Sequence, residues 1–461
     1  MSLGLPFDPR RRIVSRPPLL GESLVTGRIF HTSDWHLGRH IGRRRRDDEF
    51  AAVLAEIVSI AENFAPDLIV HSGDLFDGSR PSLDDLRLAS ETLRRLGRIA
   101  PTVVVAGNHD TRPVLTFLQY VLDAAGHTPD HRVRFVTDTG SGGPMVAEYP
   151  AADGEHTIRI GALAYLHPNR FTYDLADPGT ATTSFAQQMR HVQGEVYRRL
   201  GAGRGPRDIL VYAAHLFVEG ATPSHSERPI SLRSDYAVPA ARLPLVDYGA
   251  LGHIHKPQRI DSVGFPAHYA GSPLQLDFGE TKDTKSVVLV EIDPGKDPRI
   301  ELVPLSSGRR LVKLTGTLDE IAQRARRVGD AWVKAIVDTD SPTLGLSETL
   351  AAMLPHATII DIQERRAGTA SPILDRSAAT AEVPSAESLL HDYLIDREVT
   401  GRRLDHVMAA LAHLQSEPDP IDPAPCCEEK LLTAAIDGHG LDDVDRAGLL
   451  PGFATDGSAV R

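Results

Sequence analysis

The sequence predicts an α/β fold in which two β-sheets pack together and helices flank them, with a smaller α/β domain near the C-terminal side. Three observations lead to this prediction. Apolar strand-like segments alternate with amphipathic helical segments between residues 28 and 107. Strand-like segments dominate from 131 to 293, and a second alternation of strands and helices begins near Arg309.

The first alternation predicts a largely parallel sheet. Three apolar segments are typical of buried strands and two segments carry apolar residues at helical spacing, namely 28–32, 67–71 and 101–107, and 47–64 and 83–97. Gly97 is expected to end the second helix, because glycine favours the left-handed conformation that closes many helices. A strand–helix–strand–helix–strand order implies a sheet that is buried on both faces.

The remainder of the chain divides into a second sheet and several further regions. Four more strands are predicted, at 157–166, 208–216, 246–254 and 287–293. The expected domains are a flexible extension at 1–27, a main domain at 28–308, a small α/β capping domain at 309–365, a linker at 366–383, two amphipathic helices at 384–415 and a mobile acidic tail at 416–461.

Composition favours a soluble globular protein. The chain is 41% hydrophobic and 24% charged, and it has no apolar run long enough to cross a bilayer. Its two cysteines, Cys426 and Cys427, are adjacent, so a disulfide framework is not expected and a cytoplasmic location is. The net charge of −12 disfavours nucleic-acid binding in general, but arginines cluster at Arg43–Arg46. This cluster either contacts DNA phosphates or is balanced by the acids that follow it.

Polar residues of the kinds that bind metals or catalyse hydrolysis follow the predicted strands. They are Asp34, His36, Asp74, Asn108, His109, Asp110, His215, His253 and His255. Taken singly, each is more often a turn residue or a structural histidine. All of them, however, come just after apolar strands, and ligands in α/β proteins gather outside the carboxyl ends of strands. The joint pattern therefore predicts one shared cleft.

The residue types in this pattern indicate divalent cations. Carboxylate, amide oxygen and imidazole together favour Mn²⁺, Fe or Zn²⁺ over Ca²⁺. Residues i and i+2 of an extended segment point the same way, so Asp34 and His36 can address one ion together. His253 and His255 have the same spacing. Two such ions would activate water and neutralise charge on a phosphoryl group, which predicts phosphoester hydrolysis.

The motif series DWH, GDLFD, GNHD, AHL and GHIH resembles the calcineurin-like metallophosphoesterases. The longer segments HTSDWHLG, HSGDLFD, VVAGNHD, YGALGHIHKPQ and YAGSPLQLDFGE resemble the SbcD-type nuclease subunits of that superfamily. The resemblance runs from about Arg28 to Asp293, and the later segments agree with these nucleases in layout alone.

The resemblance implies a role for each motif position. Asp34, His36, Asp74 and His255 would hold one Mn²⁺, whereas Asp74, Asn108, His215 and His253 would hold the second, with Asp74 bridging the pair. His109 would face the scissile phosphate, and Asp110 would orient His109. The implied activity is cleavage of double-strand DNA ends and hairpins in repair and recombination.

The resemblance also implies partners. The chain has no Gly-x-x-x-x-Gly-Lys-Ser/Thr loop, so ATP dependence would come from an SbcC-like ATPase docked on the helices at 384–415. The expected assembly is a homodimer within a heterotetramer, without a membrane partner. Two alternatives remain: a standalone phosphoesterase acting on a small phosphodiester or a phosphoprotein, and a DNA-end scaffold without catalytic activity.

Overall fold

The computed structural model describes most of the chain between residues 27 and 366. The described ranges are 27–124, 133–137, 145–151, 154–167, 178–224, 226–227, 237–340 and 343–366, together with single positions between 390 and 408. Two compact units are distinguished, Met1–Ala370 and Ser371–Arg461, and the elements discussed below lie in the first. No helix of the described part is both long and apolar enough to cross a membrane.

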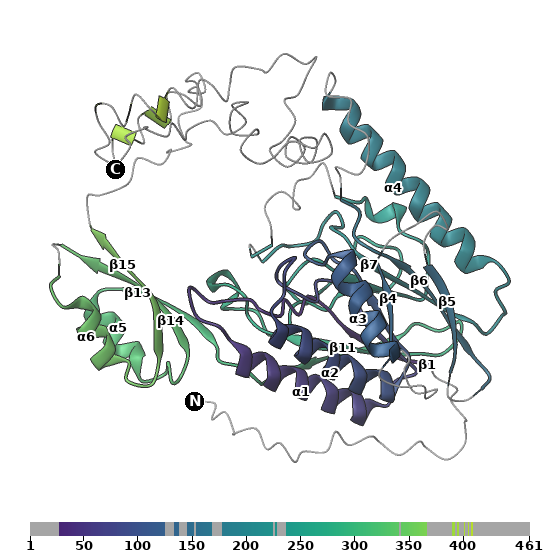
Figure 1. Cartoon of the computed structure of the whole chain (residues 1–461), viewed down its shortest axis with the longest axis horizontal. Helices are drawn as coiled ribbons and strands as arrows, with labels where there is room; N and C mark the ends of the chain where they lie inside the picture. The colour runs from purple at the N-terminus through teal and green to yellow at the C-terminus, as the bar shows by residue number, and fades with distance from the viewer. Residues whose placement is uncertain are drawn as a thin grey trace, which may run out of the picture. The chain divides into compact units, whose positions relative to one another are not determined.

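The first six-stranded sheet holds the N-terminal strands of the described chain (Figure 1). Its strands, in order of pairing, are β12 (Arg299–Pro304), β11 (Ser286–Ile292), β1 (Gly27–Thr32), β2 (Leu68–His71), β3 (Thr102–Val105) and β4 (Val133–Val136). The strands β1 to β4 are parallel, and β11 and β12 are antiparallel additions at one side. This is the parallel sheet that the alternating sequence pattern predicts.

Alternate residues of these strands enter two different cores. Phe30 and Ile69 pack with the helices α1 (Asp47–Phe64), α2 (Leu83–Ile99) and α3 (Arg112–Ala124). Their neighbours Ile29 and Val70 instead pack with strands of the second sheet. Because successive side chains in a strand point to opposite faces, one strand can contribute to both layers.

The second six-stranded sheet packs against the first and is covered on its outer face by α4 (Pro178–Gly201). Its strands, in order of pairing, are β5 (Met145–Pro150), β6 (Thr157–Leu163), β7 (Ile209–His215), β8 (Tyr248–Gly252), β10 (Ala267–Tyr269) and β9 (Gln258–Arg259). A Cβ atom on Gly161 would lie 2.7 Å from Val196 of α4, so glycine permits the close approach of helix and sheet. The predicted two-sheet α/β architecture is confirmed.

A three-stranded parallel sheet forms the small domain that follows. Its elements are β13 (Leu311–Gly316), α5 (Leu318–Ala325), β14 (Trp332–Thr339), α6 (Leu346–Met353) and β15 (Thr358–Arg366). The buried Glu49 of α1 joins it to the main domain, since Glu49 accepts hydrogen bonds from Trp332 Nε1 at 2.6 Å and from the Arg309 amide at 2.8 Å. The guanidinium of Arg309 stacks over Trp332 at 3.5 Å.

One predicted helix end is wrong. Helix α2 does not stop at Gly97 but continues to Ile99, and its C-cap Ala100 is extended. Pro101 follows Ala100, and a residue before proline is disfavoured in the helical conformation, so the proline sets the end of the helix. The predicted strand at 157–166 is shorter in the structure and ends at Leu163.

Several predicted regions lie outside the described residues. These are residues 1–26 of the extension predicted at 1–27, the linker beyond residue 366 and the acidic tail at 416–461. Gly27, the last residue of the predicted extension, is instead the first residue of β1. Within the predicted helical pair at 384–415, the described positions 390–391, 394–395, 404 and 407–408 are helical.

Candidate metal centre

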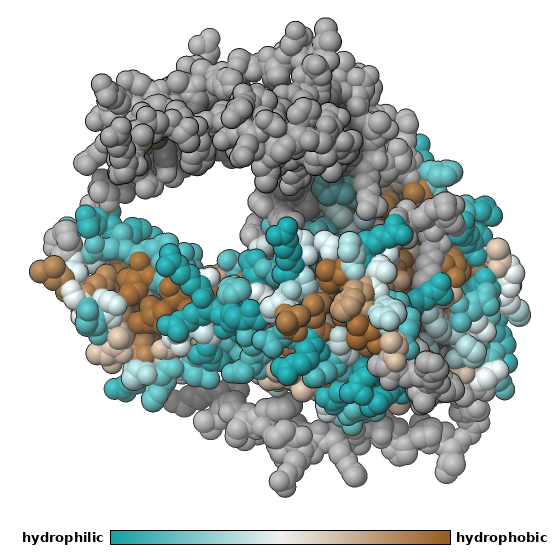
Figure 2. All heavy atoms as spheres, viewed as in Figure 1, coloured by the Kyte–Doolittle hydropathy of each residue, from teal (hydrophilic) through white to brown (hydrophobic). Residues whose placement is uncertain are grey.

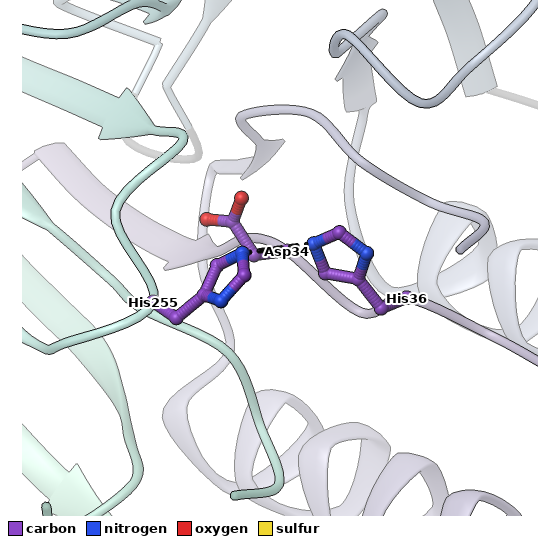
Figure 3. A group of neighbouring side chains, drawn as sticks. All are labelled: Asp34, His36 and His255. Atoms are coloured by element: carbon purple, nitrogen blue, oxygen red, sulfur yellow. Dashed lines mark hydrogen bonds between the residues drawn. The ribbon is translucent and has the colours of Figure 1, made fainter. Parts of the chain in front are cut away.

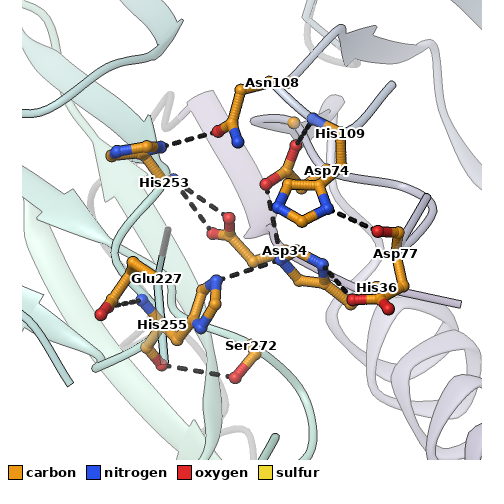
Figure 4. A network of polar contacts seen from close by, with 12 residues as sticks. Asp34, His36, Asp74, Asp77, Asn108, His109, Glu227, His253, His255 and Ser272 are labelled. Carbon is orange, nitrogen blue, oxygen red and sulfur yellow. Dashed lines mark hydrogen bonds and ion pairs between the residues drawn. The ribbon is translucent and has the colours of Figure 1, made fainter. Parts of the chain in front are cut away.

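The predicted ligand residues meet at the carboxyl edge of the two sheets, and Figure 4 labels all of them except His215. They follow the ends of the parallel strands β1, β2, β3 and β8, except for His215, which is the last residue of the parallel strand β7. The side chains of Asp34, His36, Asp74, His215 and His255 are almost fully buried. Segments more than two hundred residues apart in sequence are thus brought into one polar cluster between the sheets, as with His36 and His255.

The first ligand group consists of Asp34, His36 and His255, whose potential ligand atoms all lie within 4.8 Å of one another (Figure 3). The Nε2 atoms of the two histidines are 3.0 Å apart. That distance is close to the separation of two adjacent ligands around an ion with metal–nitrogen bonds of about 2.1 Å. The group fits a divalent cation.

The second ligand group consists of Asn108, His215 and His253. Asn108 Oδ1 lies 2.9 Å from His215 Nε2 and 2.9 Å from His253 Nδ1, and these two nitrogens are 3.3 Å apart. Three ligand atoms of two kinds therefore converge on one small volume. An amide oxygen and two imidazoles suit a borderline cation such as Mn²⁺, Fe²⁺ or Zn²⁺.

Asp74 lies between the two groups. Its Oδ2 atom is 3.4 Å from His36 Nε2 of the first group and 3.4 Å from His215 Nε2 of the second. Its Oδ1 atom accepts a hydrogen bond from the His109 amide at 2.8 Å. A single carboxylate in this position can serve two ions at once, which is the role that the family resemblance implies for Asp74.

The backbone at the site is strained. Five non-glycine residues of the described chain have positive φ angles, and four of them are predicted ligands: Asp34 (50°), His36 (49°), Asp74 (55°) and His253 (106°). Such conformations cost on the order of 1–3 kcal/mol each and persist where surrounding structure enforces them. Their concentration here indicates that the chain places these side chains at the expense of local stability.

Glycines make the crowding at these strand ends possible. A Cβ atom on Gly73 would lie 2.1 Å from His215 Nδ1, and one on Gly107 would lie 2.1 Å from Asp74 Oδ1. Both distances are far below van der Waals contact. These glycines are therefore required by the close approach of backbone to ligand side chains.

Burial and mutual charge shift the pKa values of the cluster. Burial raises the pKa of Asp34 to about 7. Burial acts in the same direction on Asp74, but the neighbouring His215 and His36 hold the pKa of that carboxyl well below its usual value. Burial lowers the pKa of His215, yet Asp74 outweighs it and raises this pKa to about 9. When divalent cations are bound, their positive charge would balance these carboxylates in place of protonated histidines.

His109 and Asp110 lie at the rim of the cluster. The Nδ1 atom of His109 is 2.5 Å from the backbone carbonyl oxygen of Asp77, which fixes the ring, and the ring lies edge-on to His36 at 4.7 Å. The Asp110 carboxylate accepts hydrogen bonds from the amides of Leu75, Phe76 and Gly107. Asp110 thus holds together the two loops that carry Asp74 and His109, and its predicted action on the His109 ring stays a prediction.

Three residues that the sequence motifs do not single out as functional support His255 on the side away from the ligand cluster. Ser226 Oγ lies 2.6 Å from His255 Nδ1 and donates a short hydrogen bond to Glu280, whose Oε1 is 3.4 Å from the same nitrogen. Lys285 Nζ contacts Glu280 at 2.7 Å and donates to the His255 carbonyl at 2.8 Å. Such partners orient a metal-binding histidine and raise its basicity.

A signal for Glu280 was present in the sequence. It closes the segment YAGSPLQLDFGE, whose resemblance to SbcD-type nucleases does not by itself indicate a role for Glu280. Asp77, in the GDLFD motif, was likewise not assigned, although its carboxylate lies 3.3 Å from His36 Nδ1. Trp35, between two ligands, is fully buried and donates a hydrogen bond to Thr32 Oγ1, so its ring is a packing element of the site.

Comparison with known proteins agrees with this geometry. Residues 27–257 match the calcineurin-like phosphoesterase family, which is half of the chain. The chain belongs to the calcineurin-like phosphoesterases. Within this family it is of the SbcD type, since residues 307–398 match the SbcD_C family, described as the type 5 capsule protein repressor C-terminal domain.

The relatives found are nuclease subunits. The chain is 35% identical to the SbcD subunit of the SbcCD nuclease from Bacillus subtilis over 62% of this chain and 71% of that protein. It is 26% identical to the corresponding SbcD subunit from Escherichia coli K12 over 84% of this chain and 98% of that protein. A dimetal phosphatase structure from Danio rerio aligns with 61% of this chain and 99% of that one, at 15% identity and a TM-score of 0.34. As a calcineurin-like phosphoesterase, the chain is a metal-dependent hydrolase of phosphoesters.

Proposed function

We propose that this calcineurin-like phosphoesterase is the two-metal DNA nuclease subunit of a complex with an SbcC-like ATPase, and that it cuts double-strand ends and hairpins in DNA repair and recombination. The observation that carries the proposal is the arrangement of two ligand groups around Asp74. Relatives named as the SbcD subunit of the SbcCD nuclease supply the substrate class and the partner.

The proposed chemistry is hydrolysis of a phosphodiester. Two divalent ions, one held by Asp34, His36, Asp74 and His255 and the other by Asp74, Asn108, His215 and His253, would activate a water and neutralise charge on the phosphoryl oxygens. The mix of carboxylate, amide oxygen and imidazole suits Mn²⁺, Fe or Zn²⁺, and Mn²⁺ is the proposed ion because the resemblance to SbcD-type nucleases implies it.

The protein contributes positioning and a proton-transfer group. His109 is held through Nδ1 by the Asp77 carbonyl, next to the His36 ring. This position supports the proposal that His109 hydrogen-bonds a phosphate oxygen or protonates the leaving oxygen. The strained backbone at Asp34, His36 and Asp74 keeps these ligands aimed before substrate arrives, so that little reorganisation is required during reaction.

A homodimer is the proposed arrangement of the nuclease subunits. Helix α3 buries Leu115, Leu118 and Leu122 against its own domain and exposes Phe117 (55%) and Tyr120 (70%) on another face. Figure 2 shows hydrophobic surface in the area that α3 occupies in Figure 1. An apolar face of this kind supports contact with a second copy.

The C-terminal helices at 384–415 are the proposed docking element for the ATPase, and the domain at 309–365 is proposed to limit which DNA reaches the metals. Truncation before Pro384 should leave Mn²⁺-dependent hydrolysis of a simple phosphodiester unchanged and abolish binding to the SbcC-like subunit. A pull-down beside a model-ester assay measures both. Full-affinity binding by the truncated chain would place docking elsewhere, and loss of ester hydrolysis through unfolding would place the helices in the core.

The decisive experiment compares substrates. The purified chain with Mn²⁺ should cleave duplex DNA ends, faster with the ATPase and ATP, and should act poorly on cyclic nucleotides and phosphopeptides. The opposite preference would favour a standalone phosphoesterase. Absence of all metal-dependent turnover would leave a scaffold role. A cytoplasmic location is proposed as well, in keeping with a DNA substrate.

A further inference from the structure

The four consecutive arginines Arg43–Arg46 separate into two pairs with different surroundings. Arg45 contacts Asp47 at 2.7 Å and Asp85 at 3.3 Å. Arg46 is buried and contacts Glu49 at 2.8 Å. The charges of Arg45 and Arg46 are therefore balanced by acidic residues of α1 and α2, which agrees with the expectation that nearby acids balance the cluster.

Arg43 and Arg44 are exposed, and within the described residues their guanidinium groups have no acidic partner. They are part of a tight turn in which Ile41 and Arg44 exchange backbone hydrogen bonds of 3.0 and 3.1 Å, with Gly42 at a φ of 59°. Ile41 anchors this turn by packing against Leu311 and Trp332. The backbone that carries the two arginines is thus held in place by hydrogen bonds and by packing.

The turn forms one wall of a cleft between the main domain and the small domain. The cleft has a volume of about 490 Å³ and is lined by Gly42, Arg43, Arg44, Phe278, Lys334, Ile359, Ile360 and Asp361. Lys334, from β14, adds a third cation and lies 3.0 Å from Asp361, the one acid in the lining. Three cations against one carboxylate make the cleft electropositive in a chain whose net charge is −12.

The cleft is also close enough to the metal centre to hold the same DNA molecule. Arg43 lies seven positions after the ligand His36, and a fully extended chain of that length spans at most about 25 Å. One turn of duplex DNA is about 34 Å long. A phosphate bound by Arg43 would therefore lie within about one helical turn of the bond that is cut.

We infer that this cleft, with Arg43 and Arg44 as its principal cations, binds backbone phosphates of duplex DNA outside the metal centre. This inference rests on the proposed nuclease function and adds a binding site to it. Arginine suits the role, because its planar guanidinium binds phosphate through two parallel hydrogen bonds. The contacts are to the backbone, so they fix the register of the duplex without selecting a sequence.

The test is the salt dependence of DNA binding by the full chain. The Arg43→Gln/Arg44→Gln variant is compared with wild type by fluorescence anisotropy, using a labelled duplex whose phosphorothioate linkages keep the charge but resist cleavage. Loss of two phosphate contacts should lower the slope of log affinity against log salt by about 1.8. Between 50 and 200 mM salt, wild type should then lose roughly tenfold more affinity than the variant.

Matched variants isolate the site. Arg98→Gln/Arg242→Gln removes two exposed arginines outside the cleft and should leave the slope unchanged. Asp361→Asn frees Lys334 and should tighten binding by about twofold to fivefold. Arg43→Lys/Arg44→Lys keeps the charges and should retain most of the slope.

The outcomes separate the inference from the proposed function. Three results would each overturn the inference that the cleft binds DNA. The first is an equal slope for wild type and the Arg43→Gln/Arg44→Gln variant, and the second is an equal loss of slope in the Arg98→Gln/Arg242→Gln control. The third is the absence of duplex binding by wild type. Model-ester hydrolysis with Mn²⁺ should be the same in all variants. If wild type binds duplex with the expected slope but does not cut it, the cleft stands and the nuclease function fails.

Discussion

The parallel strands of the main domain and those of the small domain end in different ways. Beyond β1, β2 and β8 come Asp34, Asp74 and His253, which all have positive φ angles and lie in a buried polar cluster. In the small domain, the described residues 311–340 and 343–366 include no non-glycine residue at positive φ and no buried charged side chain. There, β13 leads through Gly316 into Thr317, which forms an unstrained capping box with Glu320.

The difference shows that a parallel α/β arrangement does not by itself create a metal-binding site at its strand ends. Both regions follow the strand–helix alternation of α/β proteins, yet only one concentrates strain and charge at its strand ends. Strain and buried charge cost stability, and they persist where a bound ligand or a function compensates for them. Substitutions at the metal centre should therefore lower the rate of phosphodiester hydrolysis, whereas substitutions in the small domain should lower the free energy of unfolding.

The largest expected effect is that of Asp74→Ala. Removing the shared carboxylate should release both ions and abolish phosphodiester hydrolysis, while circular dichroism shows a folded chain. Elemental analysis of the purified variant measures the metal content. Retention of two ions per chain would show that Asp74 does not bridge them.

His109→Gln should separate catalysis from metal binding. Loss of a positioned proton donor lowers turnover by about 10²–10⁴-fold, and metal content should stay at the wild-type level. A parallel loss of metal would instead make His109 a ligand, in the group that it forms with His36 and Asp77. The readouts are turnover of a model diester and bound metal per chain.

Glu280→Gln should have a smaller effect. It weakens the support of His255 without removing a ligand, and such changes cost about 10–100-fold in metal affinity or activity. Mn²⁺ titration of the stripped protein measures the affinity. The control is Glu56→Gln. The Glu56 carboxylate accepts hydrogen bonds from the amides of Ser306 and Ser307 and is not part of the metal centre. Equal affinities for wild type and Glu280→Gln would reduce Glu280 to a packing role.

Leu350→Ala tests the expectation that substitutions in the small domain lower stability and leave hydrolysis unchanged. Leu350 is fully buried in the core of the small domain, and truncation of such a side chain costs about 2–5 kcal/mol. Denaturant unfolding should register this loss, whereas turnover of a model diester with Mn²⁺ should not change. A drop in turnover at full folding would mean that the small domain shapes the metal centre.

Much of the fold could be predicted because its pattern is local. Helix α1 has the predicted bounds, Asp47–Phe64, since its apolar spacing and its acidic first turn both lie within the segment. The ligand residues could be predicted to converge because carboxyl ends of parallel strands share one edge of a sheet.

Other features depend on tertiary contacts that no local pattern reveals. Gly97 looked like a helix end, but it lies buried inside α2 and the following proline determines the boundary. Glu280 reaches His255 from a short 3₁₀ turn 25 residues farther along the chain, through Ser226 and beside Lys285. Such support is visible only once the three segments are packed together.

The pairing of β1 with β11 has a consequence for synthesis. Gly27 is opposite Ile292, so this central strand gains its second neighbour only after some 265 further residues have been made. At about 5–20 residues per second, the delay is roughly 15 to 50 seconds. Over that interval one edge of β1 is available for wrong pairing. A nascent chain halted between residues 255 and 280 would in addition contain every proposed ligand but lack Glu280 and Lys285, which support His255.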